Sequence, residues 1–263
     1  MPFTRERTRQ AGRFWWDKAG PSGTDVRPLL AVIFGIDALA DIECDGHRMA
    51  YNAAFAVHDL DITWTVEHYR RLLRIPDERR RLVADLRFRG CGASADTLAA
   101  RVHRTKQELF EQGILDADVG PRPGLVDLVM SLFVAGVWVA VATPGRRAWV
   151  QPMVRQLIGD GLVETIVTSD DLDSDDASVH ALALWELGIA PEAALCVEGS
   201  AAGMRAATAI GLPTVMVGVA DGAQRYRRAA AVRPSYEGPD PMLAAGCARL
   251  HARWWGVRRR LTA

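Results

Sequence analysis

Short apolar runs alternate with helical segments along most of the chain. Residues 29–34 form an apolar run between Pro28 and Gly35, which is typical of a buried strand. Similar runs predict further strands at 137–142, 165–167, 194–197 and 213–217, each preceded by a segment of helical periodicity, at 125–135, 149–159, 179–187 and 201–210. This alternation predicts an α/β fold in which helices cover both faces of a parallel sheet.

The region between the first two predicted strands has a different pattern. It contains charged segments of helical periodicity, for example 65–74 and 95–112, and no convincing strand. We therefore predict a core formed by residues 29–41 and 120–225, with residues 42–119 inserted as an all-helical cap domain. The flanking segments are interpreted as an N-terminal extension at 1–28 and a C-terminal extension, rich in tryptophan and arginine, at 226–263.

Composition narrows the class of protein. The 263 residues carry 32 Lys+Arg and 32 Asp+Glu, and this balance argues against general affinity for nucleic acid or anionic membranes. No apolar run approaches the ~18 residues of a membrane span, and the first residues lack the apolar region of a secretory signal. The four cysteines show no metal-ligand spacing and are interpreted as reduced. We expect a soluble, cytoplasmic protein.

Four segments, in the right order and spacing, carry a family resemblance. Residues 31–41 (AVIFGIDALAD) resemble a strand followed by Asp-x-Asp-Gly-Thr, and 139–143 (VAVAT) resemble a strand ending in Ser/Thr. Residues 196–207 (CVEGSAAGMRAA) are similar to Glu-Asp-Ser-x-x-Gly followed by a helix, and 43–55 to the entry of a helical cap. Over about residues 29–220 the chain thus resembles the haloacid dehalogenase (HAD) superfamily, in its beta-phosphoglucomutase/CbbY-like branch. The resemblance implies a HAD-like Rossmannoid sheet with an inserted cap.

The resemblance also implies which residues stand at the reactive positions. Members of the superfamily form an aspartyl-phosphate, assisted by Mg²⁺, a lysine and a Ser/Thr that bind the phosphate oxygens. Matched position by position, the nucleophile is replaced by Gly35, whereas the acid/base is retained as Asp37 and the Ser/Thr as Thr143. In the fourth motif Glu198 is retained, but the neighbouring metal-ligating aspartate is Gly199. Asp37 acts either as a general acid/base or merely as a cap of the following turn.

The lysine position of the third motif is also changed. Residues 169–177 (SDDLDSDDA) place Asp175 or Asp176, depending on register, where this branch has lysine. The two lysines of the chain, Lys18 and Lys106, lie in the N-terminal extension and in the cap. With Asp176 beside Asp37 and the retained glutamate, the site would repel a phosphate and would suit an amine, another cation or a neutral polar molecule. We expect neither Mg²⁺ nor another cofactor.

Two further groups are candidate substrate-binding residues. Asp45, His47 and Asn52 stand where this branch places cap-entry residues that face the cleft, although His47 also fits a hydrogen-bonded hinge residue. After Thr143, the loop amides at Gly145 and the side chain of Arg146 or its neighbour could bind an anion in place of the lost lysine. The alternative is a strand-end turn with solvent-facing arginines.

Tryptophan pairs flanked by arginine lie outside the core resemblance. Trp15 and Trp16 belong to the N-terminal extension, and Trp254 and Trp255 to the C-terminal one. Tryptophan and arginine dominate the binding energy of protein interfaces, so these pairs are candidate contacts with a protein partner or a second copy of the chain. The alternative is that both extensions cover the surface of the fold itself.

Three functional hypotheses follow. The first is a non-catalytic binding or regulatory homologue, a pseudoenzyme that recognises a small molecule or a protein partner. The second is an enzyme with repurposed, metal-independent acid/base chemistry on a small polar or amine-bearing metabolite. The third is residual hydrolase activity of the phosphatase or phosphomutase type, which the loss of nucleophile, lysine and metal ligand disfavours.

Overall fold

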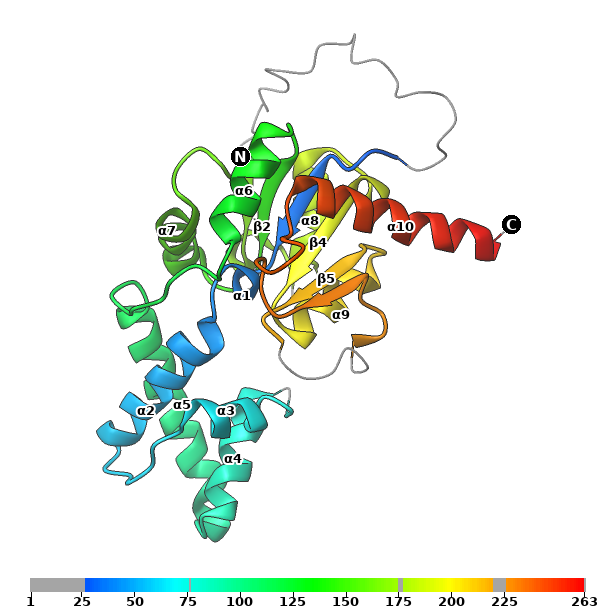
Figure 1. Cartoon of the computed structure of the whole chain (residues 1–263). Coiled ribbons are helices and arrows are strands. Elements are labelled where there is room, and N and C mark those ends of the chain that lie inside the picture. Colours follow the sequence, from blue (N-terminus) through cyan, green and yellow to red (C-terminus); the bar gives the residue numbers. More distant parts are fainter. Residues whose placement is uncertain (1–26, 76, 175–176, 220–225, 263) are drawn as a thin grey trace, which may run out of the picture.

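One parallel sheet organises the core. The computed structural model describes residues 27–75, 77–174, 177–219 and 226–262 (Figure 1). Its six strands lie in the order β3-β2-β1-β4-β5-β6, and every neighbouring pair is parallel. The strands are β1 (Ala31–Phe34), β2 (Trp138–Ala142), β3 (Thr165–Val167), β4 (Ala194–Glu198), β5 (Thr214–Val217) and β6 (Ala231–Arg233). The five predicted strands are confirmed, with boundaries shifted by one or two residues.

Helices cover both faces of the sheet, as predicted. Val32 and Phe34 face one side, where α6 (Leu125–Val134), α7 (Arg147–Ile158) and α10 (Ala244–Thr262) pack. Ile33 points to the opposite side, against α8 (Val179–Leu187) and α9 (Ala201–Ala209). This alternation follows from the two-residue period of a strand. Within the part of the chain that the structure describes, no helix is long and apolar enough to cross a membrane.

The insertion after β1 forms a helical module with its own core. We use this name for the π-helix η1 (Ile42–His47) together with α2 (Arg48–Val57), α3 (Val66–Leu72), α4 (Glu78–Phe88) and α5 (Ala95–Gly113). Its core is largely aromatic and includes Tyr51, Phe55, Trp64 and Tyr69. Figure 1 shows the module beyond the carboxyl ends of the strands, where ligands of parallel α/β sheets bind.

The two connections between core and helical module run side by side. The short helix α1 (Ile36–Leu39) leads out of β1, and the chain returns before α6. An antiparallel bridge joins Ala40 to Pro121, and the backbone N–H of Arg122 donates to the carbonyl oxygen of Leu39 at 2.7 Å. The remaining short helices are η2 (Gly92–Ser94), η3 (Ser169–Asp171) and η4 (Pro191–Ala193).

Part of the predicted C-terminal extension belongs to the sheet. The core was expected to end at residue 225, but β6 pairs with β5 in the register Val215↔Ala231. Tyr236 is fully buried, and its hydroxyl donates to the carbonyl oxygen of Ala38 at 2.7 Å. The prediction missed β6 because its three residues end in arginine and, unlike the predicted strands after β1, follow no helical segment of the alternating pattern.

Candidate functional site

The side chain of Glu198 fills the space at the end of β1. Glu198 is the last residue of β4 and is 3% exposed. A Cβ atom at Gly35 would lie 2.7 Å from its carboxyl carbon, and a Cβ atom at Gly203 would lie 2.8 Å from its Oε1. Real Cβ atoms do not approach other atoms so closely. The carboxylate can therefore occupy this position only because both neighbours are glycines.

Two buried side chains share one oxygen of this carboxylate. His180, from the first turn of α8, contacts Oε1 of Glu198 through Nε2 at 2.7 Å. The Cys196 thiol donates to the same oxygen at 3.8 Å. Burial raises the pKa of Glu198, and the hydrogen bond from His180 opposes that rise. No role for His180 was predicted from the sequence. The only signal for this cluster is that Cys196 and Glu198, two residues apart on one strand, must point to the same face of the sheet.

Asp37 lies beside this buried group on α1 and is half-buried. Desolvation raises the pKa of its carboxyl well above the usual range, and the nearby carboxylates of Glu43 and Glu198 raise it further. Arg122 opposes the shift, and its Nε donates to the main-chain oxygen of Asp37 at 2.8 Å. No described residue donates a hydrogen bond to the carboxylate of Asp37 itself. The side chain is thus available to a ligand and does not cap the following turn.

Cations outside the motifs also lie around the site. Arg122 contacts Asp37, and the helical module brings Arg81 and Lys106 close enough to Glu43 to lower the pKa of that carboxyl. The sequence did not indicate them, because these residues are far from the motifs along the chain and meet them only in the folded protein. Asp176, the third expected carboxylate, lies outside the described residues.

Gly199 lies directly against the main chain of Asp37. A Cβ atom at this position would be 2.5 Å from the carbonyl carbon of Asp37. A longer side chain therefore has no space to point toward the end of β1. The structure accommodates glycine at both positions, Gly35 and Gly199, where the resemblance expects aspartate.

The loop after β2 is occupied by its own neighbours. Thr143 is buried, and its Oγ1 accepts from the backbone N–H of Gly145 at 3.3 Å. Arg146 is exposed and lies 3.4 Å from Glu111 and 4.0 Å from Asp170. Two carboxylates of the protein thus lie within ion-pair distance of the candidate anion-binding arginine, although such exposed pairs are weak.

Arg147 is engaged in the same way. Its Nη2 lies 2.5 Å from Asp171 and donates to the carbonyl oxygen of Ile166 at 2.7 Å. Its backbone N–H donates to Asp170 at 2.8 Å. The solvent-facing turn, the alternative interpretation of this loop, describes it better than an anion site does.

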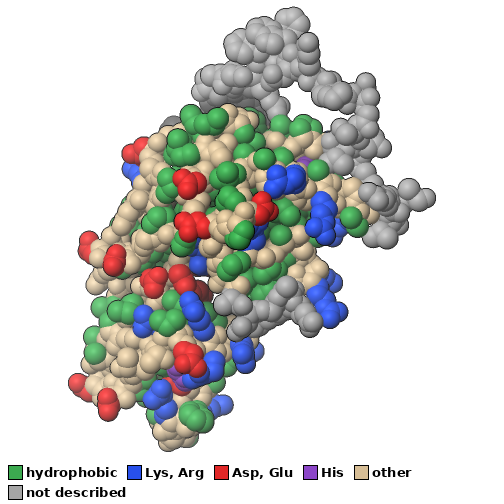
Figure 2. All heavy atoms as spheres, viewed as in Figure 1, with side chains coloured by type: hydrophobic (Ala, Val, Ile, Leu, Met, Phe, Trp, Pro, Cys, Tyr) green, Lys and Arg blue, Asp and Glu red, His purple; other side chains and the backbone are tan. Residues whose placement is uncertain are grey.

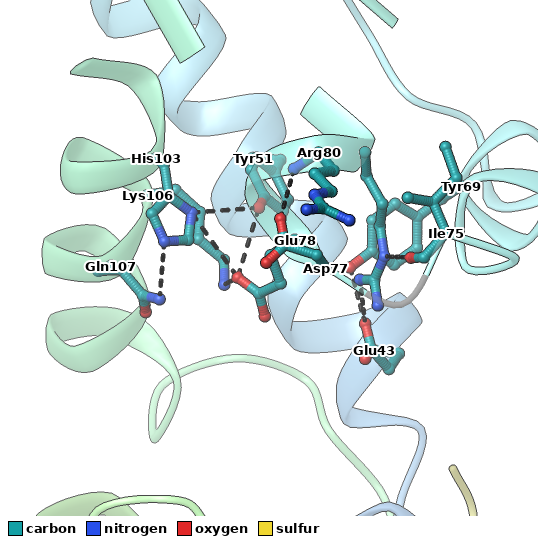
Figure 3. Close-up of polar contacts among 11 residues, drawn as sticks. Glu43, Tyr51, Tyr69, Ile75, Asp77, Glu78, Arg80, His103, Lys106 and Gln107 are labelled. Carbon is teal, nitrogen blue, oxygen red and sulfur yellow. Dashed lines mark hydrogen bonds and ion pairs between the residues drawn. The ribbon is translucent and has the colours of Figure 1, made fainter. Parts of the chain in front are cut away.

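A polar cluster lies inside the helical module, as Figure 3 shows. Lys106 is fully buried, 3.0 Å from Glu78, with its ammonium over the rings of Tyr51 and Phe110 at 5.0 and 5.4 Å from the centroids. Burial alone would raise the pKa of Glu78, but neighbouring positive charges, Lys106 above all, lower it to about 2. This pair and its ring contacts hold the lysine in the module and not at the end of the sheet.

A second pair in the same cluster reaches toward the sheet. Glu43 accepts from the Tyr69 hydroxyl at 2.7 Å (Figure 3). It also lies 3.8 Å from Nη1 of Arg81, whose Nε donates to the carbonyl oxygen of Ile75. Burial raises the pKa of Glu43, and Arg81 lowers it. Among the nearby charges, Glu43 raises the pKa of Asp37 most, so this pair links the module electrostatically to the acid/base candidate.

The three cap-entry candidates have different surroundings. Asp45 is exposed. His47 stacks on Phe110, with 4.1 Å between ring centroids, and burial beside Lys106 lowers its pKa to about 3, so its ring is neutral at physiological pH. Asn52 is occupied by main chain, because Trp64 N donates to its Oδ1 at 2.8 Å and its Nδ2 donates to Trp64 O at 3.1 Å. We therefore assign Asn52 a structural role.

Replacing Asn52 with alanine should destabilise the fold by about 1–3 kcal/mol. The substitution leaves the backbone N–H of Trp64 without a partner, and an unmet buried group costs about this much. The carbonyl oxygen of Trp64 keeps its hydrogen bond from Nη1 of Arg48 at 3.1 Å. Urea denaturation measures the change. Gln107→Ala is the matched control, because its amide is exposed and makes a single 3.5 Å contact with His103. Equal stability of the two variants would contradict the assignment.

The tryptophan pairs are only partly described. Trp15 and Trp16 lie outside the described residues. Trp254 and Trp255 are half-buried on α10, and the buried Nε1 atoms of both rings have no hydrogen-bond partner among the described residues. The guanidinium of Arg258 lies 4.1 Å from the centroid of the Trp254 ring. That these residues contact a protein partner or a second copy of the chain stays a prediction.

Comparison with known proteins identifies relatives with this architecture. A sequence model of the haloacid dehalogenase-like hydrolases matches residues 76–217. Protein CbbY of Rhodobacter capsulatus is 34% identical over 195 residues, covering 72% of this chain and 85% of that protein. The crystal structure of CbbY from Rhodobacter sphaeroides in complex with phosphate superposes with a TM-score of 0.62 at 29% identity, covering 83% of this chain and 99% of that one.

A more distant structure shares the fold. A putative beta-phosphoglucomutase from Thermotoga maritima superposes with a TM-score of 0.58 at 22% identity, over 82% of this chain and 98% of that one. Family model, relatives and fold agree with the resemblance that the motifs carried. The chain belongs to the haloacid dehalogenase-like hydrolase family, in the branch of CbbY and beta-phosphoglucomutase.

Proposed function

We propose that this chain is a binding homologue that does not transfer phosphoryl groups, and that it recognises a small neutral or amine-bearing molecule beside Asp37. The observation that carries the proposal is the position of the Glu198 carboxylate against Gly35. Glycine offers no nucleophile, and the space that an attacking side chain would need is filled by Glu198. An aspartyl-phosphate intermediate requires both the side chain and the space.

The residues at the family's metal position do not fit Mg²⁺. This ion prefers several oxygen ligands in octahedral geometry. Gly35 and Gly199 supply no side-chain oxygen, and the contacts of Gly199 with the main chain of Asp37 leave no space for one. We therefore derive no chemical step through Mg²⁺.

The charges near Asp37 favour a ligand other than phosphate. Arg81 lies by Glu43, Lys106 is paired with Glu78, and Arg122 contacts the main chain of Asp37. A phosphate would meet the carboxyl groups of Asp37 and Glu43, while Arg81 and Lys106 already face carboxylates of the protein. A bound ammonium group would donate a charge-assisted hydrogen bond to Asp37 and would keep its carboxyl ionised, and no described residue donates to that carboxyl.

We expect no Mg²⁺-dependent turnover in a screen of phosphorylated sugars and generic phosphatase substrates. The measurement is phosphate release, with Asp37→Asn as the control that separates activity at this site from contaminating activity. Turnover that is robust in the natural chain and lost in Asp37→Asn would contradict the proposal. Binding is measured separately by calorimetry with a panel of amines, polyols and sugar phosphates. The proposal expects Asp37→Asn to weaken the binding of an amine by about tenfold or more, because it removes a charged hydrogen-bond partner.

A second candidate function rests on the protonation of Asp37. Its raised pKa keeps the carboxyl protonated at pH values where an ordinary aspartate is ionised, so it can donate a proton to a bound molecule. This observation supports metal-independent acid/base chemistry in the same place. The test is product analysis of the calorimetric ligands after incubation. Turnover that falls as the pH rises through the pKa of Asp37, and that Asp37→Asn abolishes, would replace the binding function with this one.

A further inference from the structure

We propose that His180, Cys196 and Glu198 form a binding site for a zinc-class divalent cation. Their donor atoms, an imidazole nitrogen, a thiol sulfur and a carboxylate oxygen, all lie within 4.8 Å of one another. All three residues are buried, and they come from two elements, α8 and β4. Within the described part of the chain, no other three His, Cys, Asp or Glu residues come this close.

The geometry requires only small side-chain movements. Donors at about 2.0–2.3 Å from a tetrahedral zinc ion lie about 3.3–3.8 Å from one another. The sulfur of Cys196 and Oε1 of Glu198 are already 3.8 Å apart, whereas Nε2 of His180 is 2.7 Å from the same oxygen. The His180–Glu198 hydrogen bond therefore has to open by less than about 1 Å. Cation binding replaces the thiol proton of Cys196, which is released to solvent.

The donor set selects the class of metal. Sulfur and imidazole ligands favour Zn²⁺ and Co²⁺, whereas Mg²⁺ and Ca²⁺ favour oxygen. Three protein ligands leave a fourth position of the tetrahedron for water or another ligand. The site adjoins the metal position implied by the family resemblance and shares Glu198 with the fourth motif, but its other two donors, His180 and Cys196, belong to none of the residues that the resemblance implies as metal ligands.

Hydrogen bonding within the core accounts for one nitrogen of His180, because Nε2 contacts Oε1 of Glu198. The side chain is 2% exposed, and Nδ1 is buried without a hydrogen-bond partner among the described residues. An unmet buried nitrogen costs about 1–3 kcal/mol, which an apolar residue at this position would avoid. His180 is therefore a polar ring that the fold keeps in its core, beside the other two donors.

Titration of the chelator-treated full chain with Co²⁺ and Zn²⁺ tests the proposal. We expect one Co²⁺ per chain, a near-ultraviolet charge-transfer band from thiolate to Co²⁺, and displacement of that band by Zn²⁺. Cys196→Ser should abolish the band and weaken Zn²⁺ binding by at least about tenfold, because even changes outside the first ligands cost this much. Cys91→Ser is the matched control, since Cys91 is more exposed and lies in the helical module. It should leave band and affinity unchanged.

A second measurement needs no variant at a buried position. X-ray absorption at the zinc edge of the natural chain should show one sulfur and two or more nitrogen or oxygen ligands. Glu198→Gln provides a further variant if Cys196→Ser does not fold. Absence of a one-to-one complex, a Co²⁺ complex without the thiolate band, or a zinc spectrum without sulfur would each overturn the proposal.

Discussion

Replacing Gly35 with aspartate should destabilise the protein by about 3–5 kcal/mol and should restore no phosphoryl transfer. The backbone at Gly35 has φ −71° and ψ 154°, an extended conformation that any residue adopts, so the effect arises from the side chain alone. The Cβ atom of the new side chain would lie 2.7 Å from the carboxyl carbon of Glu198, and the substitution adds a second acid beside this buried one. Overpacking and an unpaired buried charge are both strongly destabilising. Urea denaturation and phosphate release measure the two expectations.

Two further variants make this result specific to the collision. Gly113→Asp adds the same side chain where no atom lies within 4 Å and should change stability by less than about 0.5 kcal/mol. In Gly35→Asp combined with Glu198→Ala, the two substitutions should be less destabilising together than the sum of their separate effects. A Gly35→Asp chain that is as stable as the natural one, or that gains Mg²⁺-dependent phosphatase activity, would contradict both the packing argument and the proposed function.

Glu78→Gln should destabilise the helical module by about 3–5 kcal/mol at neutral pH. The substitution leaves the fully buried ammonium of Lys106 without its anion, and breaking a buried ion pair from one side has this magnitude. Thermal and urea unfolding measure the change. Glu108→Gln is the control, because Glu108 is exposed on the same helix as Lys106 and should shift stability by less than about 0.5 kcal/mol.

The pH dependence of this difference follows from the two pKa shifts. The pKa of Glu78 is lowered to about 2, so its contribution is present above its ordinary value of 4.5 and is lost as the pH falls toward 2. Burial also lowers the pKa of Lys106, so the unfolded chain binds that proton more tightly, and rising pH removes the cost of burying the charge. The difference in the free energy of unfolding between the natural chain and Glu78→Gln should therefore be largest near neutral pH. It should decrease both at lower and at higher pH. A difference that is constant with pH would show that charge is not its cause.

The strands, the helices on both faces and the family could be predicted because each depends on local pattern. Apolar runs of three to six residues and intervening helical periods specify a parallel sheet with little ambiguity. The sixth strand was missed because Ala231–Arg233 ends in a charged residue and follows no helical segment, and α10 was missed because it mixes arginine with tryptophan. What decides their structure is contact with the completed sheet.

The site was predicted less completely than the fold. The positions of Gly35, Asp37 and Glu198 at neighbouring strand ends follow from topology, but the contact between Glu198 and the glycines depends on side-chain direction. The helix of His180 was predicted with correct ends, yet its sequence, VHALALWEL, is apolar nearly all round and does not indicate which face meets the sheet. Lys106 could have been placed, since it continues the buried stripe of Ala99, Val102 and Phe110 along α5.

The hydrogen bond from Tyr236 to Ala38 has a consequence for how the chain acquires its structure. It joins residues 198 positions apart, and it fixes the turn that presents Asp37. During synthesis from the N-terminus this turn emerges early, but its anchor emerges only after β6. Contacts of such long sequence separation slow folding, because the loop between them must close before they contribute. The turn that carries Asp37 is therefore one of the last parts of the nascent protein to become fixed, and a chain that stops before residue 236 lacks the hydrogen bond that holds it.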